Sequence, residues 1–215
     1  MVATVNASRT ARPSLRDAQA ASTRQRVLSA AQQLFESRGY TRTTVNDIAD
    51  AAGVSAETIY KSLGGKSGLL DGIIDAAIAG PDAIPYDEQP GWRNISKLST
   101  PEQRLTAYVA FSCDILERTR PVHTIIRSAA ESEPRAADLR ARQLRLRLTR
   151  NTKHLGDFIG PALRPGITLK DAAERYCALS SPELYELLTV QLGWSKRRHQ
   201  RWLRDTVQRE LLETD

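Results

Sequence analysis

The residue types that most often carry catalysis or bind metals are few in this chain of 215 residues, and none occurs in a functional spacing. Its histidines and cysteines form no HExxH motif, no Cys/His metal pattern and no redox pair. No GxSxG nucleophile motif and no glycine-rich phosphate loop occurs. The sequence therefore predicts that the chain is not an enzyme and uses no metal or cofactor. The histidines and cysteines of the chain are His123, His154, His199, Cys113 and Cys177.

The sequence supports contact with a polyanion better than it supports catalysis or metal binding. Arg42, Thr43 and Thr44 lie at the entrance of one predicted helix. Lys66 begins another, where unpaired backbone N–H groups also favour phosphate. The net charge is +6, and the first 70 residues hold nine Lys or Arg against five Asp or Glu. The pattern therefore indicates phosphate contacts near the N-terminus.

The elements that position these residues are predicted to be helices. An apolar stripe with helical spacing begins near Thr23 and stops at Gly39, a residue typical of a left-handed helix cap. Thr44 and Asp47 form a capping-box pattern for a second helix, which Gly53 ends. These signals predict two consecutive helices before residue 54.

A third, short helix is expected to start at once, because Ser55 is a strong N-cap, and to stop near Ser62. Two short helices joined by a tight glycine-containing turn are the helix-turn-helix geometry, in which the second helix offers its first side chains to the major groove of DNA. On the turn alone, a helical corner in an ordinary bundle stays open as an alternative. A fourth helix follows from Lys66.

The longer run TRQRVLSAAQQLFESRGYTRTTVNDIADAAGVSAETIYKSLGGKSGLL, from Thr23 to Leu70, closely resembles the N-terminal domain of the TetR family of transcription regulators. Shared features include Leu34-Phe35, Arg38-Gly39-Tyr40, Ile48-Ala49, Ala52-Gly53-Val54-Ser55, Thr58-Ile59-Tyr60 and Lys66 with Leu69-Leu70. The segment LSSPELYELLTVQLGW, residues 179–194, also looks like an actinobacterial-type subset of that family. The resemblance implies a sequence-specific regulator, typically a repressor that a small-molecule effector releases from a pseudo-palindromic operator.

The resemblance also implies which residues meet DNA. It places Thr44, Tyr60 and Lys66 on phosphates, and Ser55, Ala56, Glu57 and Lys61 on bases. Arg42, Thr43 and Thr58 complete the predicted DNA-binding set. The chain departs from the family pattern at Ser62 and Leu63, where His-Phe is usual, and at Gly65, where a Ser cap is common, and this last change is expected to loosen the approach of Lys66.

The predicted fold is all-α, with an N-terminal three-helix helix-turn-helix DNA-binding domain and a C-terminal helical-bundle regulatory and dimerisation domain. We expect a flexible basic arm over residues 1–22, the DNA-binding domain over 23–70 and the ligand-binding and dimerisation domain over 71–215. Residues 80–99, rich in Pro and Gly, are the predicted linker. Later helices are expected to begin at Pro101, Pro121, Pro134, Thr168, Ser181 and Ser195.

The body carries two further predicted sites. For a ligand pocket the candidates are Trp92, Tyr108, Phe111 and His123, although the three aromatic residues could instead be core and His123 an ordinary hydrogen-bonded histidine. The resemblance implies a homodimer built from the last helices. Its candidate anchors are Tyr176, Leu184, Leu187, Leu188 and Trp202. The basic last helix is either a second nucleic-acid surface or, as we prefer, a solvated face.

The expected partners are a double-stranded DNA operator, a second copy of the chain and a small-molecule effector of unknown identity. No apolar run suits a signal peptide or a membrane span, so a cytoplasmic location without a membrane partner is predicted. Two other functions stay open: a DNA-binding regulator without a small ligand, controlled by a partner or acting as an activator, and a helical-bundle enzyme or carrier. The helix-turn-helix motif argues against the enzyme or carrier.

Overall fold

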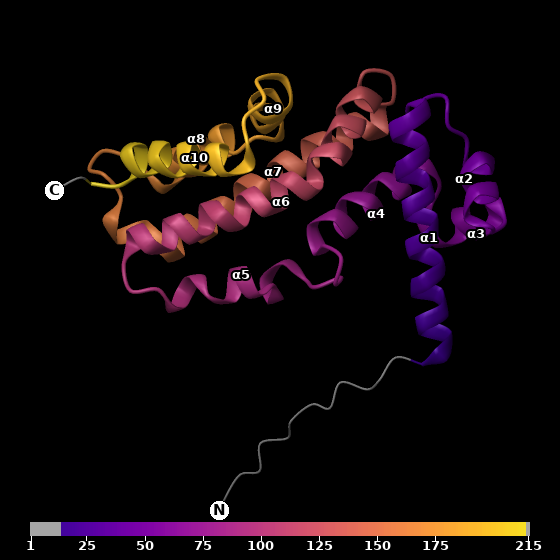
Figure 1. The fold of residues 1–215 in the computed structure, drawn as a ribbon, viewed down its shortest axis with the longest axis horizontal. Coiled ribbons are helices and arrows are strands. Elements are labelled where there is room, and N and C mark those ends of the chain that lie inside the picture. The colour runs from indigo at the N-terminus through magenta and orange to yellow at the C-terminus, as the bar shows by residue number, and fades with distance from the viewer. Residues whose placement is uncertain (1–13, 214–215) are drawn as a thin grey trace, which may run out of the picture.

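A computed structural model describes residues 14–213, and within that range the chain is built from helices with one isolated bridge between Leu163 and Leu212. This confirms the predicted all-α fold (Figure 1). The helices are α1 (Leu15–Arg38), α2 (Val45–Ala52), α3 (Ala56–Leu63), α4 (Lys66–Ala79), α5 (Pro90–Arg93), α6 (Pro101–Ala130), α7 (Pro134–Ile159), α8 (Leu169–Leu179), α9 (Pro182–Glu186) and α10 (Lys196–Leu211). Short turns are η1 (Tyr86–Glu88), η2 (Ile95–Lys97), η3 (Gly160–Ala162) and the π-helical η4 (Leu187–Gln191).

Most helix starts follow from side-chain caps that the sequence displays. Thr44 forms a reciprocal capping box with Asp47, and the same arrangement recurs at the starts of α6 and α8. Each cap supplies an acceptor to a backbone N–H that has no partner inside the helix. Simple serine caps begin α3, α9 and α10, as predicted, at Ser55, Ser181 and Ser195.

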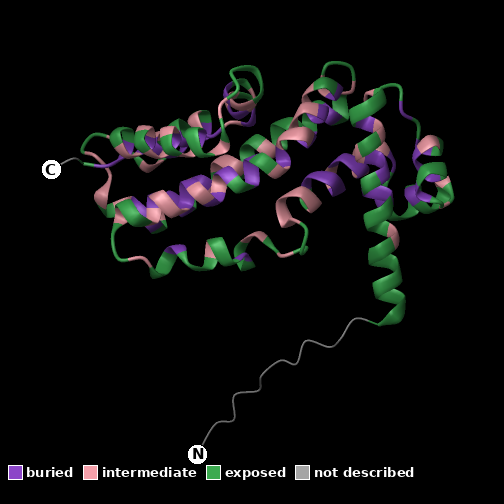
Figure 2. Cartoon of the chain, in the orientation of Figure 1, coloured by how far each residue is buried: buried purple, intermediate pink, exposed green. Residues whose placement is uncertain are grey.

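Helix α1 begins earlier than predicted. It starts at Leu15 after the N-cap Ser14, whose hydroxyl group accepts from the backbone N–H of Asp17. The prediction of a flexible arm up to residue 22 is therefore wrong for residues 15–22, which form an exposed extension of α1 (Figure 2). This stretch has no apolar stripe, so the hydrophobic pattern gave no sign of it. The rest of the predicted arm, residues 1–13, lies outside the described residues.

Helix α6 is a second correction, because it continues through Pro121 where a new helix was predicted to begin. Proline lacks a backbone N–H and usually interrupts a helix. Here α6 packs along α7 and also contacts α4 and α10, so tertiary packing outweighs the local cost. The result is one helix of 30 residues that runs from the body to the head.

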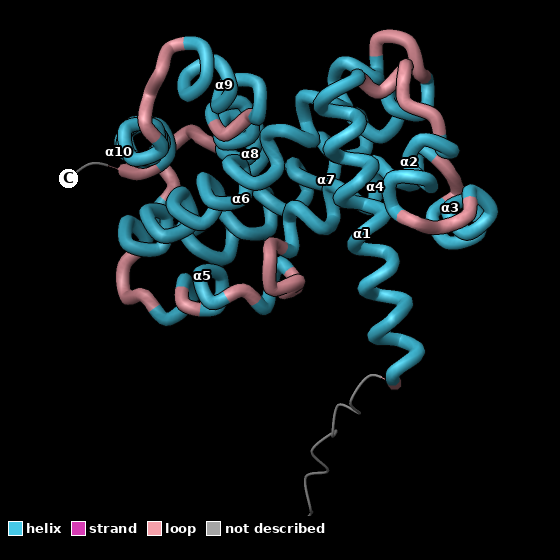
Figure 3. The backbone as a smooth tube through the Cα atoms, turned by 45° about the vertical axis from the view of Figure 1, so that its right-hand side comes forward, coloured by secondary structure: helices cyan, strands magenta, loops and turns pink. Residues whose placement is uncertain are grey.

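The buried residues form two clusters that α6 joins. The head cluster holds the inner faces of α1 to α4 together with Val122, Ile125 and Ile126 from the second half of α6. The body cluster holds residues from the first half of α6 together with the inner faces of α7, α8 and α10. Ile78, near the end of α4, packs against both clusters. Helix α4 and the long helices α6 and α7 therefore connect the head to the body (Figure 3).

The predicted linker is ordered by the body. Residues 80–99 form short helical turns along α6, and Ile95 is fully buried among them. The Gln89 side chain donates to the carbonyl groups of Ile78 and Ile84. None of the described helices is long and apolar enough to cross a membrane. Within residues 14–213, no cluster of His, Cys, Asp or Glu is arranged to hold a metal ion.

Candidate DNA-reading head and body cavity

The turn between α2 and α3 has helix-turn-helix geometry. Gly53 ends α2 with φ 65° and ψ 43°, a left-handed conformation in which most residues with a Cβ are strained. Val54 closes the turn by donating its backbone N–H to the carbonyl group of Ala49. Ile59 and Leu63 on the inner face of α3 are buried, so the opposite face of α3 points away from the head (Figure 3).

The outer face of α3 presents charged and aromatic side chains. Glu57 and Lys61 form an ion pair, with 2.7 Å between Oε1 and Nζ, and both side chains are about three-quarters exposed. Tyr60 is 58% exposed. The hydroxyl groups of Ser55 and Thr58 lie 2.9 Å apart, and Ser55 also accepts from the backbone N–H of Thr58. Glu57, Tyr60 and Lys61 are thus the side chains of α3 with the most freedom to reach a partner.

Lys66 lies beside α3 at the start of α4. Its Nζ donates to the carbonyl oxygen of Tyr40 at 2.7 Å and lies 4.1 Å from the centre of the Tyr40 ring. Partial burial lowers the pKa of Lys66, although Glu133 opposes that change. Gly65 precedes it without a side-chain cap, so the first backbone N–H groups of α4 have no capping side chain to which they can donate. Lys66 therefore links the end of α1 to the start of α4 and keeps its positive charge near the α3 surface.

The predicted residues at the start of α2 divide into exposed and buried ones. Arg42 and Thr44 are exposed, with the Arg42 Nε donating to the carbonyl group of Arg38. Thr43 is 1% exposed, and its hydroxyl group donates to the carbonyl groups of Leu34 and Gly39. The prediction that Thr43 contacts DNA is therefore wrong, because this side chain holds the turn after α1.

Gly68 is a head residue whose role sequence reasoning missed. A methyl group placed on its Cα would lie 1.6 Å from the carbonyl oxygen of Leu63. This clash shows how closely the first turn of α4 crosses the end of α3. The glycine inside a helical pattern was the available signal, because glycine in a helix lowers its stability and is kept where backbones approach closely.

Residues 27–77 match the family model described as "Bacterial regulatory proteins, tetR family". Together with the helix-turn-helix geometry of the head, this match identifies the N-terminal part of the chain. Residues 27–77 are a TetR-family DNA-binding domain. The matched segment includes α2, α3 and nearly all of α4, so the resemblance expected from the sequence is confirmed.

Individual proteins and solved structures are also similar to this chain. A curated protein of Bacillus subtilis (strain 168), named "Uncharacterized HTH-type transcriptional regulator YvkB", is 40% identical over 52 residues, which are 24% of this chain and 28% of the relative. The structure of NalD from Pseudomonas aeruginosa, a secondary repressor of the MexAB-OprM multidrug efflux pump, aligns with a TM-score of 0.66 at 19% identity over 91% of this chain and 99% of NalD. A Saccharomonospora viridis regulator in complex with choline aligns with a TM-score of 0.65 at 19% identity over 90% and 100% of the two chains.

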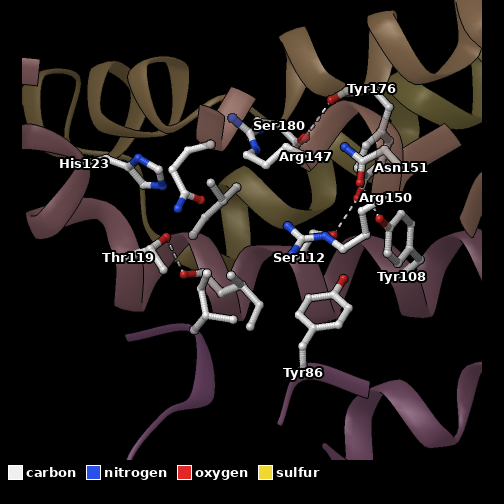
Figure 4. A pocket seen from close by; sticks show the side chains of 14 residues that line it. Tyr86, Tyr108, Ser112, Thr119, His123, Arg147, Arg150, Asn151, Tyr176 and Ser180 are labelled. Carbon is white, nitrogen blue, oxygen red and sulfur yellow. Dashed lines mark hydrogen bonds between the residues drawn. The ribbon is translucent and has the colours of Figure 1, made fainter. Parts of the chain in front are cut away.

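The body of the chain contains a cavity of about 50 Å³ between α6, α7 and α8, which opens to solvent. Figure 4 shows the polar side chains that line it. Two of the predicted pocket residues, Tyr108 and His123, lie in this lining. Trp92 and Phe111 do not line this cavity, and both rings pack against Tyr86. Phe111 is buried, which fits the alternative that it is a core residue. Trp92 is half-buried and lines a separate hollow with Arg104 and Phe158, so its assignment to a ligand pocket stays a prediction.

Several lining residues were not predicted, because they come from separate helices. Tyr86 follows the end of α4, Arg147, Arg150 and Asn151 lie on α7, and Tyr176 lies on α8. The hydroxyl group of Tyr108 donates to Oδ1 of Asn151 at 2.5 Å. Burial lowers the pKa of His123 to about 4, so this histidine is neutral near pH 7. No local motif joins these positions, and only the fold brings them together.

The cavity borders α4, the last helix of the head. Ile78, in the last turn of α4, forms part of the cavity wall. Arg118 of α6 donates to the carbonyl groups of Ala77 and Ile78 and to Oε1 of Gln89. The Arg118 side chain therefore fixes the end of α4 to α6 directly beside the cavity.

The five predicted dimer anchors differ in how far they are exposed, although all were expected to lie on a dimer surface. Tyr176 is 1% exposed and donates to the hydroxyl group of Ser112, so its assignment as an interface anchor is wrong. Leu188 is also buried, whereas Leu184 and Trp202 are half-buried. The exposed apolar surface of this region is formed by Leu187 with two residues that the sequence reasoning missed, Val190 and Leu192.

Three of the six Lys and Arg side chains of the basic last helix, α10, contact the chain's own groups, namely Lys196, Arg198 and Arg204. Lys196 binds the carboxylates of Asp114 and Glu117 on α6. The guanidinium of Arg198 stacks on the Trp194 ring at 4.1 Å, and its neighbour His199 is fully buried. These contacts agree with the preferred interpretation of a helix face that packs on one side and is solvated on the other. Both cysteines are buried and neither is in a disulfide.

Proposed function

We propose that this protein is a transcriptional repressor that binds a pseudo-palindromic operator as a homodimer and leaves it when a small molecule enters the body cavity. Residues 23–70 would form the DNA-binding domain and residues 71–215 the ligand-binding and dimerisation domain. The observation that carries the proposal is the exposed outer face of α3 on a TetR-family head.

DNA reading is supported by the charges around α3. Glu57 and Lys61 project from the helix that enters the major groove in helix-turn-helix proteins. Ala56 begins α3 and offers a methyl group of the kind that contacts thymine. Tyr60, Thr44 and Lys66 surround this face and suit phosphate contacts, which fix orientation without reading sequence.

Release by an effector is supported by the position of the cavity. A ligand that contacts Ile78 would act on the last turn of α4, whose first turn carries Lys66. Such a ligand shifts the protein away from the DNA-binding state only if it binds the other state more tightly. Two similar folds support this role. One is that of NalD, a secondary repressor, and the other is that of the choline-bound regulator.

A homodimer is supported by the exposed apolar side chains of Leu187, Val190 and Leu192, which are 41%, 55% and 59% exposed. Exposed apolar groups that gather in one region mark an interaction surface. Two heads related by two-fold symmetry would double the number of base pairs read, with recognition helices about 34–36 Å apart.

The test is a gel-shift assay with the DNA upstream of the protein's own gene. The wild-type protein should give a sequence-specific complex that unlabelled operator removes and that random DNA does not. The variant Lys61→Ala should alter this specificity, whereas Lys170→Ala, an exposed lysine of α8, should not. Absence of a specific complex with both the wild type and the control would overturn the proposal. A protein–DNA complex that no metabolite dissociates would favour a regulator without a small ligand.

A further inference from the structure

The lining of the body cavity is positively charged. It contains the guanidinium groups of Arg147 and Arg150, both from α7, and no Asp or Glu. Within residues 14–213, neither arginine forms an ion pair with a carboxylate. Figure 4 shows the Arg150 guanidinium above the Tyr86 ring, at 4.4 Å from its centre. The cavity therefore holds two cationic groups without an anion of its own.

The hydrogen bonds of the two guanidinium groups are incomplete. Arg147 donates from Nη2 to the carbonyl groups of Ser180 at 2.7 Å and Cys177 at 3.4 Å. The Nε of Arg150 is buried and has no hydrogen-bond partner among the described residues. A buried donor on a charged group without a partner is costly, and an acceptor that carries negative charge removes most of that cost.

The charged groups outside the cavity do not supply this acceptor. Glu183 is the nearest carboxylate that affects both His123 and Arg147, but it binds Arg140 at 3.0 Å on the surface. Asp75 lines a neighbouring groove together with Arg147 and Arg150, but it forms no ion pair with either of them. His123 is neutral near pH 7 and adds a hydrogen-bonding group without charge. Among the described residues, no carboxylate therefore pairs with the two arginines, and a bound anion would fill this role.

The rest of the lining suits the organic part of such an anion. Ile78, Ile115 and Leu116 give an apolar wall, and the rings of Tyr86, Tyr108 and Tyr176 lie around the arginines. Rings and aliphatic groups of this kind bind carbon frameworks, whereas an inorganic anion would leave them uncovered. His123, Gln143 and Arg147 also line an adjoining open groove between α7, α8 and α9, whose rim carries Glu174 and Glu183.

We propose that the effector is a small organic monocarboxylate whose carboxylate binds Arg150 and Arg147 and whose apolar or aromatic part fills the tyrosine- and leucine-lined space. Its role as an effector rests on the proposed function, whereas its binding does not. The similar fold of the choline-bound regulator does not set the charge of this ligand, because that cavity belongs to a chain only 19% identical to this one. Guanidinium groups prefer carboxylates, which accept two parallel hydrogen bonds.

The test compares probes of equal shape and different charge. The purified full chain is titrated with benzoate, benzamide and benzylammonium, with cinnamate, cinnamamide and cinnamylammonium, and with octanoate, octanamide and octylammonium. Binding is followed by isothermal titration and by the shift in melting temperature. At least one carboxylate should bind, and it should bind about tenfold to hundredfold more tightly than its amide, with the ammonium compound weaker still.

Variants on α7 locate the site. Arg150→Gln should remove the preference for the carboxylate over the amide, and Arg150→Lys should keep part of it as a single point charge. Arg145→Gln, an exposed residue of the same helix, is the matched control and should bind like the wild type. Equal binding of carboxylate and amide by the wild type, failure of every carboxylate to bind, or an unchanged preference in Arg150→Gln would each overturn the proposal.

Operator binding is measured separately, so the two proposals fail in different ways. A carboxylate that binds in the titration but does not dissociate the protein from the operator would support the anion site and contradict its regulatory role. A chain that binds no operator but prefers carboxylates would contradict the proposed function alone.

Discussion

At the scale of single residues, the ion pair between Glu57 and Lys61 bears on the proposed reading of DNA by the head. Both side chains are about three-quarters exposed and lie one helical turn apart. An exposed pair of this kind stabilises a helix by only ~0.3–0.5 kcal/mol, whereas a good base contact is worth ~1–3 kcal/mol. The pair therefore separates at little cost when either side chain finds a base.

We expect Lys61→Ala and Glu57→Ala to change which operator sequences are preferred more than they change overall affinity. Each removes one candidate base contact, so discrimination at one or two base pairs should fall by ~1–3 kcal/mol. Selection from a random oligonucleotide pool measures this directly. Recovery of the wild-type motif by both variants would show that α3 does not enter the major groove in this way.

Lys66→Ala is expected to weaken binding to all DNA sequences by a similar factor, because a phosphate contact carries no sequence information. The slope of log affinity against log salt should flatten by roughly 1. Because Lys66 also binds the carbonyl group of Tyr40, the melting temperature of the variant must be recorded beside its affinity. The exposed Lys170→Ala should keep the wild-type slope, and a change of motif with an unchanged slope in Lys66→Ala would contradict the assignment.

At the scale of elements, the end of α4 is held by side chains from α6 and the segment after α4. Arg118 reaches the carbonyl groups of Ala77 and Ile78, which a helix end leaves without partners. Gln89 accepts from Arg118 and donates to Ile78, so the three groups form one small network. This network lies at the end of α4, where Ile78 forms part of the cavity wall.

Arg118→Ala should therefore loosen the last turn of α4 without unfolding the head. The free energy of unfolding should fall by ~2 kcal/mol, as expected when hydrogen bonds from a charged group are lost. Hydrogen exchange followed by mass spectrometry should show faster exchange near the end of α4 and unchanged exchange in the buried part of α1. The exposed Arg145→Ala is the control, and uniform exchange in Arg118→Ala would argue against a local role.

The sequence predicted those elements whose signals are local. Caps at Thr44, Ser55 and Thr168 mark helix starts because the acceptor and the donor lie three residues apart. The early start of α1 was missed because its first turns bury nothing, and the continuity of α6 through Pro121 was missed because only packing on other helices maintains it.

The site residues also divide into those set by local sequence and those set by packing between distant segments. The exposed face of α3 is set by local helical spacing and could be predicted. The cavity could not, because Tyr86, Arg150 and Tyr176 come from three segments of the chain. The burial of Thr43 depends on a carbonyl group nine residues upstream, which no periodic pattern reveals.

At the scale of the whole molecule, the surface formed by Leu187, Val190 and Leu192 should hold two copies together. The double variant Val190→Asp with Leu192→Asp places charge on that surface without touching the buried Leu188. We expect a folded monomer that binds the operator at least tenfold more weakly, because each head alone reads half of the site. Light scattering gives the mass and circular dichroism checks folding. A wild-type monomer, or a dimeric variant with normal binding, would contradict this placement.

Acid should destabilise the protein through its buried histidines. Burial lowers the pKa values of His123, His154 and His199 to about 4, below the ordinary value of about 6.5. Between these values the unfolded chain binds more protons than the folded one, so stability falls as pH decreases from about 6.5 towards 4, by up to ~1.4 kcal/mol per histidine and pH unit. Urea unfolding at pH 7, 6 and 5 should show this trend, with a smaller slope in His123→Gln. A stability independent of pH over this range would be inconsistent with buried neutral histidines.

The meeting of the two buried clusters at Ile78 has an evolutionary consequence. Substitutions inside the head cluster are compensated by other head residues, and those inside the body cluster by other body residues, because few side chains belong to both. The two parts can therefore accumulate changes at different rates within one lineage. The family match ends at residue 77, one position before Ile78, while the aligned chains as a whole keep a similar fold at 19% identity in the structures compared. The head can therefore stay within its family pattern while the sequence of the body changes.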